Sequence, residues 1–272
     1  MKKHATTILL VLIFVLGMGL LLYPTVSDWW NSQHQSKAID TYSDNVSNMK
    51  DDEKNNLLNE AREFNKMLSE RAGYQFLSDN EKAYYKRILD ITGTGIMAYI
   101  EIPTIDVSLP IYHTVSESVL QIAVGHIEWT SLPVGGESTH CVLSGHRGLP
   151  SAKLFTNLDK IVVGDVFMIN TVGETLTYQV YEILIVEPED IAALAIEKGK
   201  DLCTLVTCTP YGINSHRLLV RGRRIANIEE KPQIVVTPEA NQIDPLVVAP
   251  IVAAPMLLVL MLYVMIKYRK KK

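Results

Sequence analysis

One cysteine and one arginine stand where two expected strands meet at a turn. Residues 202–207 form an apolar and β-branched run of strand type, which ends shortly before Pro210, a residue that cannot donate to a sheet. Cys208 therefore lies at a strand end. Arg217 begins a second apolar run, 217–221, so a hairpin would hold the thiol and the guanidinium close together. A thiol beside a fixed cation is a candidate nucleophile for covalent catalysis.

A histidine supplies the third group that this chemistry needs. Residues 141–143 read as a short strand that leads into a turn at His146. With Cys208 as nucleophile and Arg217 as oxyanion stabiliser, His146 would serve as the acid/base. Other residues could take these roles, although their plain interpretation is structural: His126 and His140 as hydrogen-bonded histidines, and Arg221, Arg223 and Arg224 as a solvated strand edge.

The segments around these residues resemble the sortase family. TLVTC at 204–208 is similar to the TLxTC cysteine motif of that family, and His146 and Arg217, nine residues after the cysteine, match its two other catalytic positions. Further stretches resemble class C, the pilin-polymerising sortases: Gly125-His126, 130–136 and 143–158. The resemblance covers roughly residues 95–225.

The resemblance implies a two-step mechanism on LPxTG-bearing pilin subunits. Cys208 would attack the threonine carbonyl of the LPxTG-like signal, and His146 would protonate the leaving glycine amine. A lysine amine of another pilin would then attack the thioester and form an isopeptide bond. The chain would thus be a thiol protease and transpeptidase of a Gram-positive bacterium. The alternatives are a sortase that attaches proteins to cell-wall peptidoglycan and a silent membrane-tethered assembly scaffold, against which the three intact residues argue.

Two further residues are candidates for substrate contact. Thr207, next to the cysteine, would either place the backbone or touch the substrate, and a plain strand threonine is the alternative. His126 belongs to a stretch that resembles the family, and its alternative is a structural histidine.

One stretch departs from the class C pattern. Enzymes of that class usually carry a lid with an Asp-Pro-aromatic type of motif before the barrel. The equivalent stretch here, 74–81, has Asp79 but neither the proline nor the aromatic residue after it. Tyr74 or Phe76 could still cover the cleft, so a lid function stays open.

Two uncharged apolar stretches predict membrane helices. Residues 5–27 and 245–266 contain no charge, and each reaches the roughly 20 residues that a helix needs to cross a bilayer. The first has the basic start of a signal peptide, but no good cleavage site follows, which favours an uncleaved anchor. Five cations in 267–272 place both ends in the cytoplasm and the catalytic part outside. The sequence therefore predicts a multi-pass protein of the cell membrane.

Charge and spacing argue against several kinds of ligand. The formal net charge of −4 falls to about −9 without the basic tail, which gives no support to nucleic-acid binding. Histidines and acidic residues show no ligand spacing, so neither a metal nor another cofactor is expected. Cys208 must stay free, and alternation places Cys203 on the opposite face of its strand. Cys141 and Cys203 read as buried thiols, with a disulfide between them as the less favoured alternative.

Short strands dominate the middle of the chain. They are expected at 97–102, 107–112 with an interruption at Pro110, 141–144, 166–170, 176–186, 202–207 and 217–221. This spacing favours a mainly β barrel, and the resemblance implies eight strands with short helices. Two amphipathic helices, 51–71 and 79–91, precede the barrel. The expected order is a cytoplasmic N-terminus (1–4), a transmembrane anchor (5–27), an extracellular stalk with a helical and lid-equivalent region (28–94), the catalytic barrel (95–228), a linker (229–244), a second transmembrane helix (245–266) and a cytoplasmic basic tail (267–272).

Overall fold

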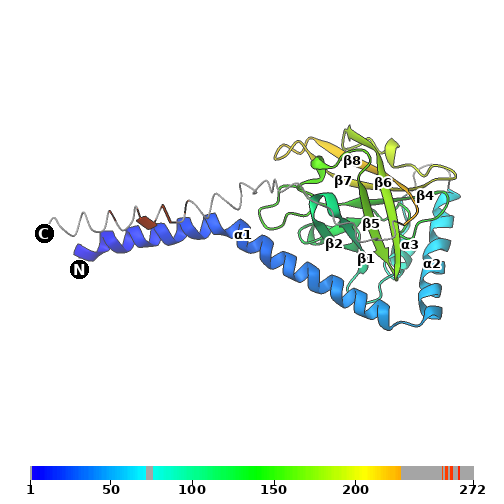
Figure 1. Ribbon diagram of the computed structural model, residues 1–272, viewed down its shortest axis with the longest axis horizontal. Helices are drawn as coiled ribbons and strands as arrows, with labels where there is room; N and C mark the ends of the chain where they lie inside the picture. Colours follow the sequence, from blue (N-terminus) through cyan, green and yellow to red (C-terminus); the bar gives the residue numbers. More distant parts are fainter. Residues whose placement is uncertain are drawn as a thin grey trace, which may run out of the picture. The chain divides into compact units, whose positions relative to one another are not determined.

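The computed structural model describes residues 2–71 and 76–227, together with six positions near the C-terminus, namely Ala253, Pro255, Met256, Leu258, Val259 and Tyr263. The chain divides into two compact units, one of residues 1–30 with 230–272 and the other of residues 31–229. The second unit contains the β-barrel and every residue singled out for chemistry (Figure 1).

Eight strands close into a barrel. Around the barrel their order is β1-β2-β3-β4-β7-β8-β6-β5, and β5 pairs with β1 to complete it. Two neighbouring pairs, β2 with β3 and β4 with β7, are parallel, and the other pairs are antiparallel. The strands are β1 (Ile96–Ile102), β2 (Val107–His113), β3 (Val124–His126), β4 (Thr139–Ser144), β5 (Val166–Thr171), β6 (Glu174–Val186), β7 (Asp201–Thr209) and β8 (His216–Arg224). The mainly β barrel that the sequence predicts is confirmed.

Alternation along the strands fills the barrel interior with apolar side chains. In β5, buried and half-buried residues alternate, as expected for a strand with one face toward a core. Phe167 of this strand stacks on Tyr178 of β6 with ring centroids 5.5 Å apart. Gly222 of β8 makes room for that pair, because a Cβ there would lie 2.6 Å from the Phe167 ring. The strand at 107–113 continues through Pro110, which pairs with Tyr99, so the predicted interruption is wrong.

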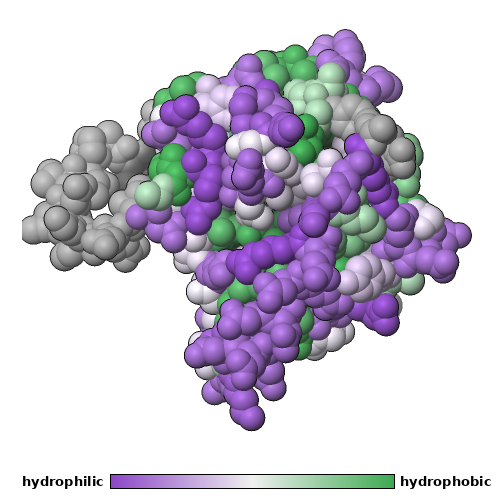
Figure 2. All heavy atoms as spheres, turned by 90° about the vertical axis from the view of Figure 1, so that its right-hand side faces the viewer, coloured by the Kyte–Doolittle hydropathy of each residue, from purple (hydrophilic) through white to green (hydrophobic). Residues whose placement is uncertain are grey.

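The helices before the barrel pack on its outside. α2 (Asp51–Ser69) buries Leu58, Ala61, Phe64 and Leu68, as its spacing predicts. The outer surface on the side of the molecule that carries α2 is mainly hydrophilic (Figure 2). Asn65 clamps the peptide at Leu132 through both its amide nitrogen, at 3.1 Å from the carbonyl oxygen, and its amide oxygen, at 2.7 Å from the N–H. α3 (Asp79–Tyr85) and α4 (Glu117–Leu120) are short, as are the 3₁₀ turns η1 (Pro103–Ile105), η2 (Leu158–Lys160) and η3 (Ala192–Leu194).

α1 (Lys2–Asn48) is longer than the predicted anchor. The polar part expected as a stalk is helical as far as Asn48, and within the barrel unit it buries Tyr42 and Val46. The Tyr42 hydroxyl donates to the Met97 carbonyl at 3.0 Å and accepts from the Val172 N–H at 3.0 Å, so the helix is hydrogen-bonded to the barrel. The stalk is therefore a packed helix at its C-terminal end.

One helix among the described residues is long and apolar enough to cross a membrane. It is the part of α1 that starts at Ile8, where aliphatic side chains such as Leu16 and Leu20 are exposed. The predicted second span at 245–266 lies outside the described residues except for the six positions named above. The basic tail at 267–272 lies outside them too.

Candidate active site

Cys208 and Arg217 face each other across two strands. They are Cα partners in the antiparallel pairing of β7 with β8, so their side chains leave the same face of the barrel. Cys208 is half-buried and therefore accessible, whereas Cys203, an odd number of residues earlier, is fully buried. The structure thus brings together the thiol and the guanidinium that the sequence placed in one hairpin.

The turn between β7 and β8 holds the arginine side chain. Arg217 Nη1 donates to the carbonyl oxygens of Asn214 at 3.2 Å and His216 at 3.1 Å. Within the described residues, Nε and Nη2 of Arg217 make no hydrogen bond, so these donors are available to an oxygen that gains charge beside Cys208.

We expect Arg217→Lys to lower the rate of acylation of Cys208 about 100-fold, because an ammonium cannot stay fixed to the turn and also present a planar fork to the oxyanion. Single-turnover mass spectrometry with a sorting-signal peptide measures this rate. Arg223→Lys on the same strand is the matched control and should react at the native rate. Equal rates for native protein and Arg217→Lys would remove Arg217 from the oxyanion site.

The parallel pairing of β4 with β7 brings the chain just before His146 alongside the end of β7. Ser144 pairs with Val206, and the Gly145 N–H donates to the Val206 carbonyl at 3.1 Å. If this register continued for two more residues, His146 would lie opposite Cys208, so their meeting stays a prediction. The His146 side chain is 28% exposed, so it can meet both the thiol and an incoming group.

Thr207 fixes this register and is buried. Its hydroxyl donates to the Gly145 carbonyl at 2.8 Å, and the residue is only 2% exposed. A Cβ on Gly145 would lie 2.7 Å from the Phe155 ring, so the chain before His146 needs glycine to pass. Of the two roles considered for Thr207, its burial and its hydrogen bond favour placement of the backbone, and substrate contact stays an untested prediction.

His126 also lies too deep to meet substrate. It has no exposed surface; its Nε2 lies 2.8 Å from the Ser131 carbonyl and its Nδ1 lies 2.9 Å from the Tyr85 hydroxyl. A neutral ring that donates from Nε2 to the carbonyl accepts at Nδ1 from the tyrosine. Burial raises the pKa of Tyr85, which keeps this hydroxyl protonated as a donor. His126 is the structural histidine that the sequence analysis gave as the alternative.

Two residues near His146 escaped the sequence analysis. Glu117 Oε2, on α4, lies 3.8 Å from His146 Nε2. Arg147 is only 9% exposed; it pairs with Asp159 at 2.5 Å and lies over the Tyr211 ring with 5.8 Å to its centroid. Arg147 thus ties the loop after His146 to the turn after β7. No spacing signal marks Glu117, because strand pairing and not sequence distance brings it to His146.

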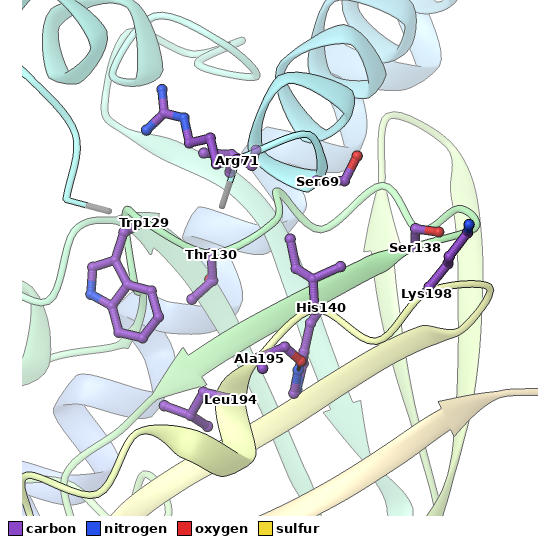
Figure 3. A pocket seen from close by; sticks show the side chains of 11 residues that line it. Ser69, Arg71, Trp129, Thr130, Ser138, His140, Leu194, Ala195 and Lys198 are labelled. Carbon is purple, nitrogen blue, oxygen red and sulfur yellow. Dashed lines mark hydrogen bonds between the residues drawn. The ribbon is translucent and has the colours of Figure 1, made fainter. Parts of the chain in front are cut away.

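An apolar cluster lies next to Cys208 on the same face of the barrel. It consists of Val142, Leu194, Val206 and Leu219, and Trp129 packs against it. Near the start of β4 this face opens into a pocket of about 500 Å³, between the end of α2 and the segment after η3 (Figure 3). Arg71, Trp129, His140, Leu194 and Lys198 are among its lining residues. Trp129 and Leu194 belong to both the cluster and the pocket, so the two adjoin each other, while His140 of the pocket pairs with Leu202, six residues before Cys208.

His140 is held neutral under this pocket. Its Nδ1 lies 2.7 Å from the Ala195 carbonyl and its Nε2 lies 2.7 Å from the Thr204 hydroxyl, so Nδ1 donates and Nε2 accepts. Burial lowers the pKa of His140 to about 4. The unfolded chain, with an ordinary histidine pKa near 6.5, therefore binds a proton that the folded chain refuses between these two values.

We expect the barrel unit to lose stability as the pH falls from about 6.5 to about 4, by up to about 3 kcal/mol from His140 alone. His140→Gln, which can keep both hydrogen bonds without titrating, should flatten this dependence. Thermal unfolding of the full chain in detergent micelles at pH 7 and pH 4.5 measures it. His216→Gln changes an exposed histidine and should keep the native slope; an unchanged slope in His140→Gln would contradict the assignment.

Of the lid-equivalent residues, Phe76 contacts Trp129 of the apolar cluster, and Asp79 belongs to α3. Phe76 is 78% exposed and meets the Trp129 ring edge-on at 6.2 Å. Asp79 begins α3, whose capping box joins Ser78 and Glu81. Tyr74 lies outside the described residues. A covering role for Phe76 stays a prediction.

The two remaining cysteines are neighbours in the barrel interior. Cys141 of β4 and Cys203 of β7 are Cα partners, both fully buried and both free thiols. Burial raises the pKa of Cys203. The structure therefore agrees with the buried-thiol interpretation.

Comparison with known proteins agrees with this geometry. A model of the sortase domain matches residues 100–225. Sortase A of Streptococcus agalactiae serotype III (strain NEM316) is 29% identical over 117 residues, which span 42% of this chain and 47% of that protein. The chain thus spans about half the length of this curated relative.

Solved structures match over a longer part of the chain. Sortase C1 of Streptococcus agalactiae is 49% identical with a TM-score of 0.69, and the match covers 71% of this chain and all of that one. Sortase C of Streptococcus pneumoniae, whose structure addresses pilin substrate specificity, is 42% identical with a TM-score of 0.64 over 70% and 97%. Sortase C-1 of Actinomyces oris is 44% identical with a TM-score of 0.60 over 64% and 99%.

Proposed function

The chain belongs to the sortase family of cysteine transpeptidases, and we propose that it cleaves an LPxTG-like signal and joins the acyl fragment to a lysine of a pilin. The pairing of Cys208 with Arg217 across β7 and β8, beside the loop that carries His146, is the observation that carries this proposal. A nucleophile, an acid/base and an oxyanion stabiliser would meet there at the ends of strands.

In the first step the Cys208 sulfur attacks the threonine carbonyl of the signal. Arg217 stabilises the oxygen that becomes negative, and His146 gives a proton to the glycine nitrogen as the C–N bond breaks. The thioacyl enzyme remains. The apolar cluster next to Cys208 suits the leucine and proline of the signal, and the pocket beyond it suits the residues before them.

In the second step a lysine amine replaces the glycine amine. The likeness to class C structures, one of which addresses pilin substrate specificity, favours a pilin as the acceptor over peptidoglycan. A wall-attaching sortase would transfer the same acyl group to a different amine, so the acceptor distinguishes the two.

The membrane arrangement is part of the same proposal. The apolar part of α1 anchors the chain, a second helix at 245–266 returns it, and the basic tail stays in the cytoplasm with the catalytic barrel outside. Labelling of a cysteine introduced in the tail by an impermeant reagent on intact cells would contradict this arrangement.

Intact-mass measurement tests the activity. The full chain in detergent micelles is incubated with an LPxTG-type peptide, and the protein should gain the mass of the fragment that ends at threonine, located on Cys208 by peptide mapping. Addition of a lysine peptide should release it as an isopeptide-linked product. No adduct on Cys208 would favour the silent scaffold, and an adduct released only by peptidoglycan amines would favour wall attachment.

A further inference from the structure

The carboxylate of Glu117 stands beside the acid/base on the side opposite to the nucleophile's strand. β3 lies between β2 and β4 in the barrel, and α4 leads into β3 where Gly125 pairs with Ser144, two residues before His146. This topology brings Glu117 Oε2 to 3.8 Å from His146 Nε2. Glu117 is 73% exposed, so its charge is open to an arriving molecule.

One side chain contacts this carboxylate, and a second supports the turn that follows it. The Gln121 amide, one turn later in the chain, donates to Glu117 Oε1, which leaves Oε2 for the histidine side. Gln35 of α1 donates to the Ile122 carbonyl at 2.7 Å and so supports the turn that carries both residues. The position of Oε2 is therefore set by the fold although the group is exposed.

The gap between the two groups argues against a direct histidine–carboxylate hydrogen bond. A nitrogen and an oxygen 3.8 Å apart are too distant for one, since such bonds measure about 2.7–3.2 Å. A polar atom of a bound molecule could lie about 3 Å from both His146 Nε2 and Glu117 Oε2 and form a hydrogen bond with each. The amine that attacks the thioester must come within that distance of His146 to lose its proton.

We propose that Glu117 binds the ε-ammonium of the acceptor lysine next to His146, so that the enzyme selects a cationic amine for the second step. This inference rests on the proposed function and names the residue that recognises its acceptor. A lysine arrives protonated at neutral pH, and a carboxylate at this place attracts that form.

The second step exchanges a C–S bond for a C–N bond. The nitrogen loses two protons, one to His146 and one to solvent, and forms a bond to the thioester carbon. The C–S bond breaks, and Cys208 leaves as the thiolate beside the imidazolium of His146. Glu117 takes no proton in this sequence; it lowers the free energy of the bound ammonium.

Glu117→Gln in the full chain tests the proposal with two acceptors. One is a peptide with a single lysine, and the other is hydroxylamine, which is neutral at pH 7.5. We expect KM for the lysine peptide to rise about three- to five-fold at low ionic strength, the range of an exposed ion pair, and the difference to shrink in high salt. Reaction with hydroxylamine and the rate of Cys208 acylation should stay within two-fold of native.

A matched variant and the possible outcomes complete the design. Glu174→Gln removes a different surface carboxylate, which pairs with Arg62 at 3.1 Å on the β5–β6 turn, and should leave every rate unchanged. Glu117→Asp keeps the charge. Its KM for the lysine peptide should therefore lie between those of the native chain and of Glu117→Gln. If Glu117→Gln slowed the reactions with lysine and with hydroxylamine equally, or left KM for the lysine peptide unchanged, the role of Glu117 would be overturned. The proposed function would not be affected by that result. Acylation without any lysine product in the native chain would overturn the pilin acceptor itself.

Discussion

Cys208→Ala is expected to lower signal cleavage by at least about 10⁴-fold, because without the sulfur no thioester can form and only substrate binding and the oxyanion site remain. The folded state should change little, since Cys208 is half-buried at a strand end and alanine fits a strand that the ladder to β8 already holds. The measurement is cleavage of a fluorogenic LPxTG-type peptide by the full chain, together with intact mass.

Cys203→Ala is the matched control for this change. It removes a thiol from the same strand, but one that points into the barrel core. It should lower stability by about 1 kcal/mol through the small cavity and leave the adduct on Cys208 intact. If Cys208→Ala still gained the acyl mass, another residue would be the nucleophile and the assignment of the motif would be wrong.

His146→Ala is expected to lower cleavage about 10³-fold, within the range for loss of a general acid. The glycine amine is a poor leaving group unless it receives a proton as the C–N bond breaks. Added imidazole should restore part of the rate, because the removed side chain leaves a site that is partly open to solvent.

His216→Ala serves as the control for the loss of a histidine. His216 pairs with Glu187 at 3.2 Å and lies next to Arg217 on β8, but on the other face of the strand. Its removal should leave cleavage within a few-fold of native. A similar loss in both variants, or no imidazole rescue of His146→Ala, would point to a structural effect instead of proton transfer.

Local patterns predicted the strands that frame the site. The β-branched run before Cys208 and the apolar run after Arg217 are long enough to predict β7 and β8 from the sequence alone. The two reactive residues lie at the ends of these runs. Adding the motif spacing was enough to propose His146, and the pairing of β4 with β7 brings the residues before it alongside those before the cysteine.

Features that depend on long-range pairing were missed. β3 has only three residues, Val124–His126, too few for a period-two pattern, and it exists because β2 and β4 pair with it on both sides. The C-terminal part of α1 reads as polar linker because few of its residues are buried; Tyr42 and Val46 decide its packing. Glu117 acquires its neighbour through β3, so it could not be found without that strand.

The parallel pairing of β4 with β7 also has a consequence for the order in which the site is assembled. Thr139 pairs with Asp201, and the next five rungs keep the same separation of 62 residues along the chain. Such non-local pairs form late, after the entropy of closing a long loop has been overcome. The hairpin of β7 and β8 can bring Arg217 to Cys208 by local pairing, but the loop that carries His146 arrives only with β4. We therefore expect the nucleophile to gain its acid/base only when the barrel is complete.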